Sequence, residues 1–303
     1  MKNKKINVLL SGIAGFIGSN LALELTNLGY SIVGIDDFST GNINNLKGVE
    51  GKMIKCDITG KLPDFGVKFD FIFHQAAITD PRHENKSEII SKNVSGMKNM
   101  VELAKKHNAK LIYASSASVY GNGPSPMKED QELNPLCEYA ESKIKCEKLA
   151  LRNTSLKSVG LRYFNVFGSN ECYKGRPASM IFHIINLCAV GKTIKLFKYG
   201  EQVRDQVYVK DVVNANILAM KENVPTGIYN VGGGIGTSFD AIAHKIRDYF
   251  DNKSRIEYVD NPYDAYQTNT IADLKHSMDK LGYEPHYNFV DGLDDYMRGL
   301  WWK

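Results

Sequence analysis

Apolar positions along the chain fall into short continuous runs, and these alternate with longer stretches in which they recur every three or four residues. Runs such as Ile6–Leu10 and Phe69–His74 are rich in β-branched and aromatic residues, which indicates buried strands. Stretches such as Ile89–His107 have helical spacing and predict amphipathic helices. Because alternating strands and helices favour parallel pairing, the pattern predicts an α/β fold with a doubly wound parallel sheet.

The alternation is regular up to about residue 165 and looser beyond it. The first part contains predicted strands at Ile6–Leu10, Ser31–Ile35, Lys52–Cys56, Phe69–His74, Leu111–Ser115 and Ser158–Tyr163, and predicted helices at Phe16–Leu28, Ile89–His107 and Tyr139–Asn153. After a long loop, the second part contains predicted helices at Ala178–Val190, Val212–Lys221, Phe239–Phe250, Ile271–Lys280 and Phe289–Leu300, and strands at Thr193–Phe197, Asp205–Val209, Gly227–Val231 and Ile256–Val259.

We expect two domains with a cleft between them. A Rossmann domain would comprise residues 1–165 and about 205–235, and a smaller α/β substrate-binding domain would comprise about 166–204 and 236–303. A chain of 303 residues with 43% apolar content is long enough to bury a core of this kind.

Charge and cysteine content exclude several classes of partner. The 38 Lys and Arg against 34 Asp and Glu leave a net charge of +4 without any basic block, which argues against nucleic-acid binding. Only the five-residue run Ile6–Leu10 follows the basic N-terminal segment before Ser11, whereas the apolar part of a signal peptide needs about 7 residues and a membrane helix about 20. We therefore expect a cytoplasmic protein with no membrane partner. The five cysteines form no CxxC pair or Cys/His cluster, so we expect reduced thiols and no metal.

A glycine-rich motif, Gly12–Gly18 (GIAGFIG), follows the first predicted strand and opens the first predicted helix. Glycines at Gly12, Gly15 and Gly18 permit a tight turn, a close approach to a pyrophosphate, and close helix–strand packing. The helix N-terminus, with Phe16 and Ile17, would bind the anion through free backbone N–H groups. The alternative is a glycine-rich turn that binds no ligand.

Two acidic residues, Asp36 and Asp37, end the second predicted strand, 18 residues beyond Gly18. An acidic side chain at this place accepts hydrogen bonds from the ribose hydroxyls of NAD and repels the 2′-phosphate of NADP. Asp36 is the first residue after the strand and is the favoured candidate. The alternative is an aspartate that only caps a turn. Together with the glycines, Asp36 indicates a dinucleotide site and favours NAD over NADP.

A third group of residues has the pattern of proton-transfer chemistry. Tyr139 and Lys143 lie four residues apart on one face of a predicted helix, and Ser116 ends the strand before it. An ammonium group near a phenol lowers the pKa of the phenol from about 10. Tyr139 could then exchange a proton with a hydroxyl or carbonyl group, while Ser116 donates a hydrogen bond to the same oxygen. The alternative is a chance Tyr-x-x-x-Lys, which the order of the motifs disfavours.

With these motifs the chain resembles, from end to end, the extended short-chain dehydrogenases/reductases of the nucleotide-sugar epimerase branch. The motifs that carry the resemblance are Gly12–Gly18, Asp36–Asn42, Cys56–Ile58, Phe73–Ala77, Asn93–Gly96, Tyr113–Gly121, Tyr139–Lys143, Arg162–Gly168 and Arg204–Val209. The resemblance implies a tightly bound NAD, a nucleotide-diphosphate-sugar substrate and a homodimer. It also implies a cofactor site that includes Asn42, Asp57, Ile58, Ala76, Ala77 and Asn93, and a substrate site that includes Thr79, Asn165, Ser179, His183, Arg204 and Tyr266.

The residues after Ser116 narrow the reaction within this branch. Sugar-nucleotide dehydratases carry an Asp-Glu pair there and decarboxylases a Glu, whereas this chain has Ala117 and Ser118. Dehydration is therefore disfavoured. The resemblance then implies epimerisation, in which a sugar hydroxyl is oxidised to a ketone and hydride returns to the opposite face, with the hydride chemistry supplied by the cofactor.

The segment Glu171–His183 is similar to the corresponding segment of the ADP-glycero-manno-heptose 6-epimerases, in which a lysine at the position of Lys174 acts as a second acid/base. Lys174 could instead be a solvated loop lysine or a contact to the diphosphate. The segment Asp36–Asn42 reads like UDP-hexose 4-epimerases, which are the alternative family. A ketosugar reductase that uses NADPH and a non-catalytic NAD-binding module are the remaining alternatives.

Overall fold

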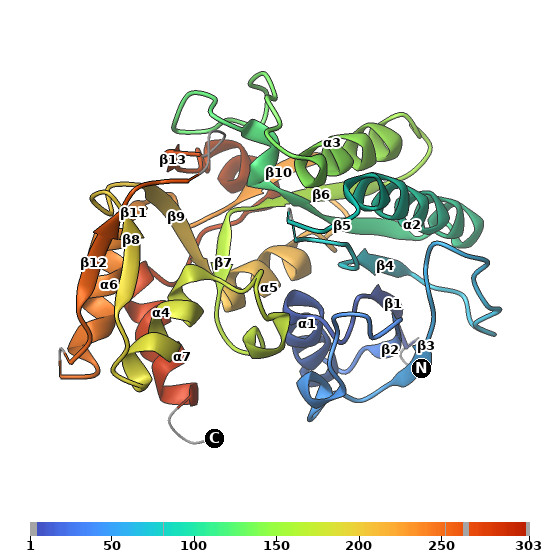
Figure 1. Ribbon diagram of the computed structural model, residues 1–303. Helices are drawn as coiled ribbons and strands as arrows, with labels where there is room; N and C mark the ends of the chain where they lie inside the picture. The colour runs from blue at the N-terminus through green and yellow to red at the C-terminus, as the bar shows by residue number, and fades with distance from the viewer. Residues whose placement is uncertain (1–4, 81, 252, 263–266, 301–303) are drawn as a thin grey trace.

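The structure is a computed structural model that describes residues 5–80, 82–251, 253–262 and 267–300. Its largest element is a seven-stranded sheet with the order β10-β6-β5-β4-β1-β2-β3, in which every pair is parallel (Figure 1). The strands are β1 (Asn7–Ser11), β2 (Ser31–Asp36), β3 (Lys52–Lys55), β4 (Phe71–His74), β5 (Lys110–Ser116), β6 (Ser158–Tyr163) and β10 (Gly227–Val231). The strand order reverses between β1 and β4, so the sheet is doubly wound and the predicted fold class is confirmed.

Helices cover both faces of this sheet. Helices α1 (Phe16–Asn27) and α5 (Val209–Leu218) pack together on one face, and α2 (Lys86–His107) and α3 (Glu138–Leu151) pack side by side on the other (Figure 1). An apolar core fills the space between the sheet and the helices on each face. Alternate residues of β1 point into the two cores, since Val8 and Leu10 join the core beneath α1 while Leu9 joins the core beneath α2. Burial on both faces explains why the strands read as continuous apolar runs.

The second part of the chain builds a smaller body with a core of its own. One small sheet contains β7 (Asn165–Phe167), β9 (Val203–Tyr208), β11 (Gly236–Ser238) and β13 (Asn269–Thr270), and β8 (Ile194–Phe197) pairs with β12 (Ile256–Val259). Helices α4 (Met180–Ala189), α6 (Phe239–Asp248) and α7 (Phe289–Leu300) share the third core cluster with these strands. The return of β10 to the large sheet supports the predicted domain division, which stays a prediction.

The predicted helix at Ile271–Lys280 is wrong in its first half. Residues 269–270 form β13, and Ala272 makes an isolated parallel bridge to Met127. A π-helical turn covers only Ser277–Leu281. The cause is tertiary, because Met127 N donates to Ile271 O at 2.7 Å and the buried Asp205 carboxylate accepts from Ala272 N at 3.0 Å. These bonds hold extended a segment whose apolar spacing is also compatible with a helix.

Two element boundaries also differ from expectation. Helix α2 begins at Lys86, three residues before the first apolar position, because the Asn85 side chain caps it and accepts from Glu88 N. Helix α5 follows β9 directly at Val209 instead of beginning near Val212. Among the helices that the structure describes, none combines the length and the apolar content that a bilayer crossing requires.

Candidate active site

The predicted glycine motif forms a tight turn between the end of β1 and the start of α1. Gly12 has φ of +73°, and a Cβ built on it would lie 2.5 Å from Ala76 N in the loop after β4. A Cβ on Gly18 would overlap the Gly12 carbonyl oxygen. These two positions therefore require glycine for packing, and they bring Ala76, a predicted cofactor residue, against the turn.

The N-terminus of α1 is open. No side chain caps this helix, whose N-cap is Gly15. A Cβ on Gly15 would meet only Gly12 O within 4 Å, at 3.2 Å, so little of the surrounding protein crowds this position. Free N–H groups at a helix N-terminus with room before them suit a phosphate group. The residues present therefore fit the pyrophosphate of a dinucleotide.

The Asp36 carboxylate links the glycine turn to the end of β2 through hydrogen bonds. Its carboxylate accepts from Ala14 N at 2.9 Å and from Phe38 N at 2.8 Å, and burial raises its pKa. Asn42 N donates to Ala14 O at 3.0 Å, so Asn42 braces the same turn. Asp37 is exposed and accepts from Ser39. The structure thus places Asp36, rather than Asp37, beside the turn.

The other predicted cofactor residues lie in two groups. Asp57 is exposed and accepts from the backbone and hydroxyl of Thr59, which lowers the pKa of Asp57, and the adjacent Ile58 packs under α2 near Gly96. Asn93 is a structural link, because its side chain accepts from Ile78 N at 2.8 Å and donates to Ile78 O at 3.1 Å and to Ser142 Oγ at 2.9 Å. Asn93 therefore fixes the loop after β4, which contains Ala77 and Thr79, to α3.

The structure brings Ser116, Tyr139 and Lys143 together. Ser116 ends β5, and its hydroxyl is hydrogen-bonded to that of Tyr139 near the start of α3. Lys143 Nζ lies 5.7 Å from the centroid of the Tyr139 ring and donates to Ala114 O at 2.8 Å. Ser118 Oγ donates to Ser116 Oγ at 2.9 Å.

The pKa of Tyr139 differs from expectation. Burial raises it to about 12, and the hydrogen bond from Ser116 opposes this only in part. The expected lowering by Lys143 is wrong for this protein because the ammonium group is turned to the Ala114 carbonyl and desolvation of the phenol is the larger effect. Burial also lowers the pKa of Lys143. The phenol of Tyr139 is therefore protonated at neutral pH, the form that donates a proton.

His74 connects this group to the glycine turn. It ends β4, and its Nδ1 lies 2.8 Å from Ser11 Oγ at the end of β1. Burial, with a smaller contribution from the charge of Lys143, lowers the pKa of His74 to about 3. Ser11, His74 and Ser116 each end a parallel strand, so the candidate site lies at the carboxyl edge of the large sheet, where the strand order reverses.

Lys174 also reaches the glycine turn. It lies in a 3-10 turn, Cys172–Lys174, and its Nζ is 5.5 Å from the centroid of the Phe16 ring at the start of α1. Burial lowers the pKa of Lys174, and the charge of Glu171 opposes this shift. Sequence reasoning missed Glu171, whose buried carboxylate accepts from Gly168 N at 3.0 Å and Ser179 N at 2.8 Å and so closes the loop.

The predicted substrate residues are more scattered. Ser179 caps α4 by accepting from Phe182 N, and His183 Nε2 lies 3.2 Å from Arg176 O, so both border the Lys174 loop. Arg204 is buried on β9, where it donates to Val203 O and Gln267 O and lies over the Phe239 ring. Asn165 is exposed at the start of β7 and Thr79 is half-buried. Tyr266 lies outside the described residues.

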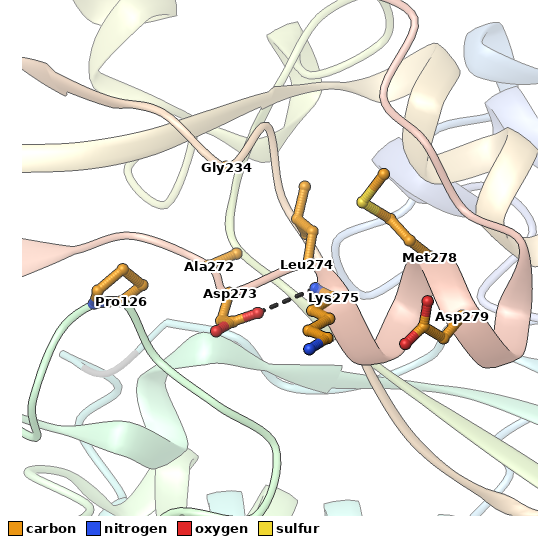
Figure 2. Close-up of a pocket in the computed structure, with 8 residues that line it drawn as sticks. All are labelled: Pro126, Gly234, Ala272, Asp273, Leu274, Lys275, Met278 and Asp279. Carbon is orange, nitrogen blue, oxygen red and sulfur yellow. Dashed lines mark hydrogen bonds between the residues drawn. The ribbon is translucent and has the colours of Figure 1, made fainter.

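A pocket of about 560 Å³ lies elsewhere on the surface (Figure 2). It is lined by Pro126, Gly234, Ala272, Asp273, Leu274, Lys275, Met278 and Asp279, which include none of the predicted site residues. In the part of the chain that the structure describes, no group of three or more His, Cys, Asp or Glu residues is arranged to hold a metal ion.

Comparison with known proteins agrees with this geometry. Residues 8–232 match the model of the NAD dependent epimerase/dehydratase family. The chain is 35% identical to an ADP-L-glycero-D-manno-heptose-6-epimerase of Brachyspira hyodysenteriae, with 97% of each chain covered. Among solved structures, the Helicobacter pylori ADP-L-glycero-D-manno-heptose-6-epimerase is similar at a TM-score of 0.90 and 33% identity, covering 99% of this chain and 98% of the other.

A second kind of epimerase is similar as well. The UDP-N-acetylglucosamine 4-epimerase of Methanobrevibacter ruminantium has a TM-score of 0.89 at 29% identity, with 98% of each chain covered. The match to the family model spans the glycine turn, the Ser116, Tyr139 and Lys143 group and the Lys174 loop. The chain belongs to the NAD dependent epimerase/dehydratase family of enzymes.

Proposed function

We propose that this enzyme is a nucleotide-sugar epimerase that oxidises a sugar carbon transiently to a ketone and then inverts it, acting on ADP-glycero-manno-heptose. The observation that carries the proposal is the meeting of two candidate proton-transfer groups at one glycine turn. Tyr139 lies beside Lys143, whose charge acts on His74 next to the turn, and Lys174 lies over Phe16 at the start of α1. Full-length similarity to ADP-heptose 6-epimerases supports this substrate over the UDP-hexoses.

The cofactor in this proposal is NAD, which supplies the acceptor and donor of hydride when it is bound. The N-terminus of α1 at Gly15, Phe16, Ile17 and Gly18 would hold the pyrophosphate, and Asp36 the adenosine ribose. A buried carboxylate beside the turn disfavours a 2′-phosphate through charge repulsion, which supports NAD over NADP. Asp57, Ala76 and Ala77 would line the remaining cofactor surface.

The protein side chains supply proton transfer and orientation. As the phenolate, Tyr139 would take the hydroxyl proton when the sugar carbon is oxidised and would return that proton to the carbonyl oxygen when the ketone is reduced, while Ser116 would donate a hydrogen bond to the same oxygen. Lys143 would hold the nicotinamide ribose. No carboxylate follows Ser116, since Ala117 and Ser118 occupy those positions and Ser118 bonds to Ser116 itself. This supports epimerisation over dehydration.

Lys174 would act as the second acid/base. Its lowered pKa increases the fraction of neutral amine that can accept a proton near neutral pH. Two candidate proton-transfer groups from different elements, Tyr139 on α3 and Lys174 on the 3-10 turn, suit a reaction in which a ketosugar is reduced from either face. Asn165 and Arg204 would contact the substrate diphosphate. The enzyme would be a homodimer whose subunits meet through α2 and α3. It would act in the cytoplasm.

The test is turnover by the purified enzyme on a panel of nucleotide sugars, followed by NMR of the sugar protons. We expect inversion of carbon 6 in ADP-glycero-manno-heptose and no reaction with UDP-glucose, UDP-N-acetylglucosamine or GDP-sugars. Inversion of UDP-hexoses alone would favour the 4-epimerase alternative. Net consumption of NADPH would instead indicate a ketosugar reductase, and tight NAD binding without turnover of any sugar would indicate a binding module.

A further inference from the structure

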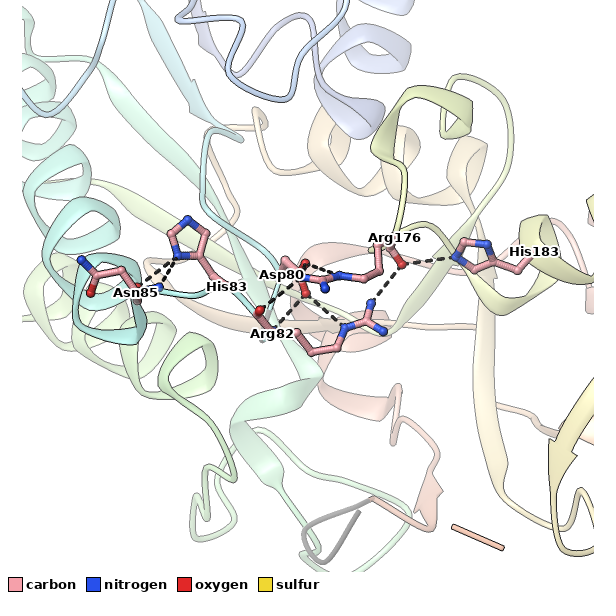
Figure 3. Close-up of polar contacts among 6 residues, drawn as sticks. All are labelled: Asp80, Arg82, His83, Asn85, Arg176 and His183. Atoms are coloured by element: carbon pink, nitrogen blue, oxygen red, sulfur yellow. Dashed lines mark hydrogen bonds and ion pairs between the residues drawn. The ribbon is translucent and has the colours of Figure 1, made fainter. Parts of the chain in front are cut away.

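The loop after β4 and the Lys174 loop are joined by an ion pair that sequence reasoning did not find (Figure 3). Asp80 Oδ2 accepts from both Nε and Nη2 of Arg176, at 3.0 and 2.6 Å. These residues are 96 positions apart, and they come from the two loops that carry Thr79 and Lys174. A carboxylate that accepts two bonds from one guanidinium fixes the direction of the pair as well as its distance.

Arg82 adds a second set of bonds to this connection. Its Nε lies 3.3 Å from Asp80 Oδ1, and its Nη2 donates to Arg176 O at 3.1 Å. Arg176 Nη2 donates in turn to Arg82 O at 3.1 Å, so the two arginines are crossed, each bonding to the other's backbone. His183 Nε2 also lies 3.2 Å from Arg176 O. The backbone of the Lys174 loop is thus held at Arg176 from two sides.

On the side of the large sheet, the loop that contains Asp80 is held in place by two sets of contacts. Asn93 in α2 bonds to both the N–H and the carbonyl of Ile78, two residues before Asp80. Ala76, two residues earlier still, packs against Gly12. On the other side, only Gly175 separates Arg176 from Lys174, whose ammonium lies over the Phe16 ring. Asp80 therefore restricts where Arg176 can lie, and through Arg176 it restricts where Lys174 can lie.

We propose that Asp80 is a positioning residue, which holds the loop of residues 171–177 through Arg176 so that Lys174 stays over the glycine turn. The catalytic consequence rests on the proposed function, in which Lys174 is the second acid/base. The effect on the loop itself does not, and it can be measured without a substrate. Asp80 is 17% exposed and Arg176 58%, so salt screens the pair in part.

The first experiment measures hydrogen exchange of the holoenzyme over residues 171–183, in which Lys174 N donates to Glu171 O and Ala178 N to Gly175 O. Asp80→Asn and Arg176→Gln should each speed exchange there roughly 3- to 5-fold, the range expected for one ion pair. The double variant should speed exchange by less than the product of the two single effects, because both substitutions remove the shared bonds between Asp80 and Arg176. Exchange at the wild-type rate in both single variants would overturn the proposal.

Lys157→Gln is the matched control. It breaks a different ion pair, that of Lys157 with Glu222 at 2.9 Å, which joins the residue before β6 to the segment after α5. This variant should leave exchange over residues 171–183 unchanged. Faster exchange in the control as well would mean that the loop responds to any loss of charge, which also contradicts the proposal.

The second experiment measures kcat and KM with the sugar that the enzyme inverts. Asp80→Asn should lower kcat about 10-fold, as expected for a misplaced reacting group, and it should have no further effect in a Lys174→Met background. Equal losses in both backgrounds would overturn the role in positioning Lys174. If the wild-type enzyme inverts no nucleotide sugar, the proposed function fails while the exchange experiment still decides whether Asp80 holds the loop.

Discussion

Tyr139 has an environment that favours its protonated form, because the phenol is buried and the Lys143 ammonium over its ring donates its hydrogen bond to the Ala114 carbonyl. Its proposed role is proton exchange with the sugar oxygen. Removing a general acid/base of this kind costs about 10²- to 10⁴-fold in rate. We therefore expect Tyr139→Phe to lower kcat by about 10³-fold with little change in KM.

Tyr229→Phe is the control for this prediction. Tyr229 is a buried tyrosine on β10 whose hydroxyl donates to Pro225 O, away from the site. It should retain near-wild-type kcat. Steady-state kinetics of both variants, with circular dichroism to check folding, make the comparison, and a Tyr139→Phe enzyme with unchanged kcat would contradict the proton-transfer role.

His74 makes stability depend on pH. Its pKa is about 3 in the folded protein and near 6.5 in the unfolded chain, so the unfolded chain binds an extra proton between these values. The contribution of His74 is therefore complete above pH 6.5 and is lost as the pH falls toward 3. Between pH 7 and pH 5 we expect a loss of about 2 kcal/mol in the free energy of unfolding from this residue.

Urea unfolding at both pH values measures this loss. His74→Asn keeps a polar side chain but cannot titrate, so the difference between pH 7 and pH 5 should shrink by about the same amount. An unchanged pH dependence in His74→Asn would show that the buried imidazole is not the cause.

At the scale of elements, two glycines of the same turn have different expected roles. Gly18 matters for the stability of the fold, and Gly15 matters for cofactor binding. A Cβ at Gly18 collides with the Gly12 backbone, whereas one at Gly15, the N-cap of α1, meets only Gly12 O at 3.2 Å. We expect Gly18→Ala to unfold at a clearly lower temperature. Gly15→Ala should melt within a few degrees of wild type without cofactor and lose most of its affinity for NAD.

Thermal melting and calorimetric titration with NAD distinguish the two variants. Equal NAD affinity in Gly15→Ala and wild type would contradict placement of the pyrophosphate at this helix N-terminus. A Gly18→Ala variant as stable as wild type would show that the turn relaxes around the added methyl group.

The elements also show what local sequence can predict. Strands such as β1 are buried on both faces and α2 has an apolar stripe, so pattern alone locates them. The helix predicted at Ile271–Lys280 is wrong in its first half because Asp205 and Met127, far away in sequence, hold that half extended. The order of the motifs along the chain likewise predicted that Ser116, Tyr139 and Lys143 lie together. The burial that raises the pKa of Tyr139 and the hydrogen bond from Lys143 to the Ala114 carbonyl both depend on tertiary packing and have no sequence signal.

At the scale of the whole molecule, the candidate site is assembled from both parts of the chain. The large sheet supplies the glycine turn, His74, Ser116 and α3, and the segment after β7 supplies Lys174. The pair of Asp80 and Arg176 joins these parts across 96 positions, which no local pattern indicates. The family could be inferred from the sequence because its motifs are local. The contacts between loops could not, because they exist only in the folded chain.

The central claim is that one enzyme both oxidises and reduces the same sugar carbon. The most direct test uses the nucleotide sugar identified by the panel, deuterated at the carbon that is inverted, with the reaction run in H₂O. The proposed function predicts that the inverted product keeps its deuterium and that no NADH accumulates. Loss of the deuterium to solvent during inversion would contradict it, because inversion would then proceed by proton exchange at carbon without transient oxidation.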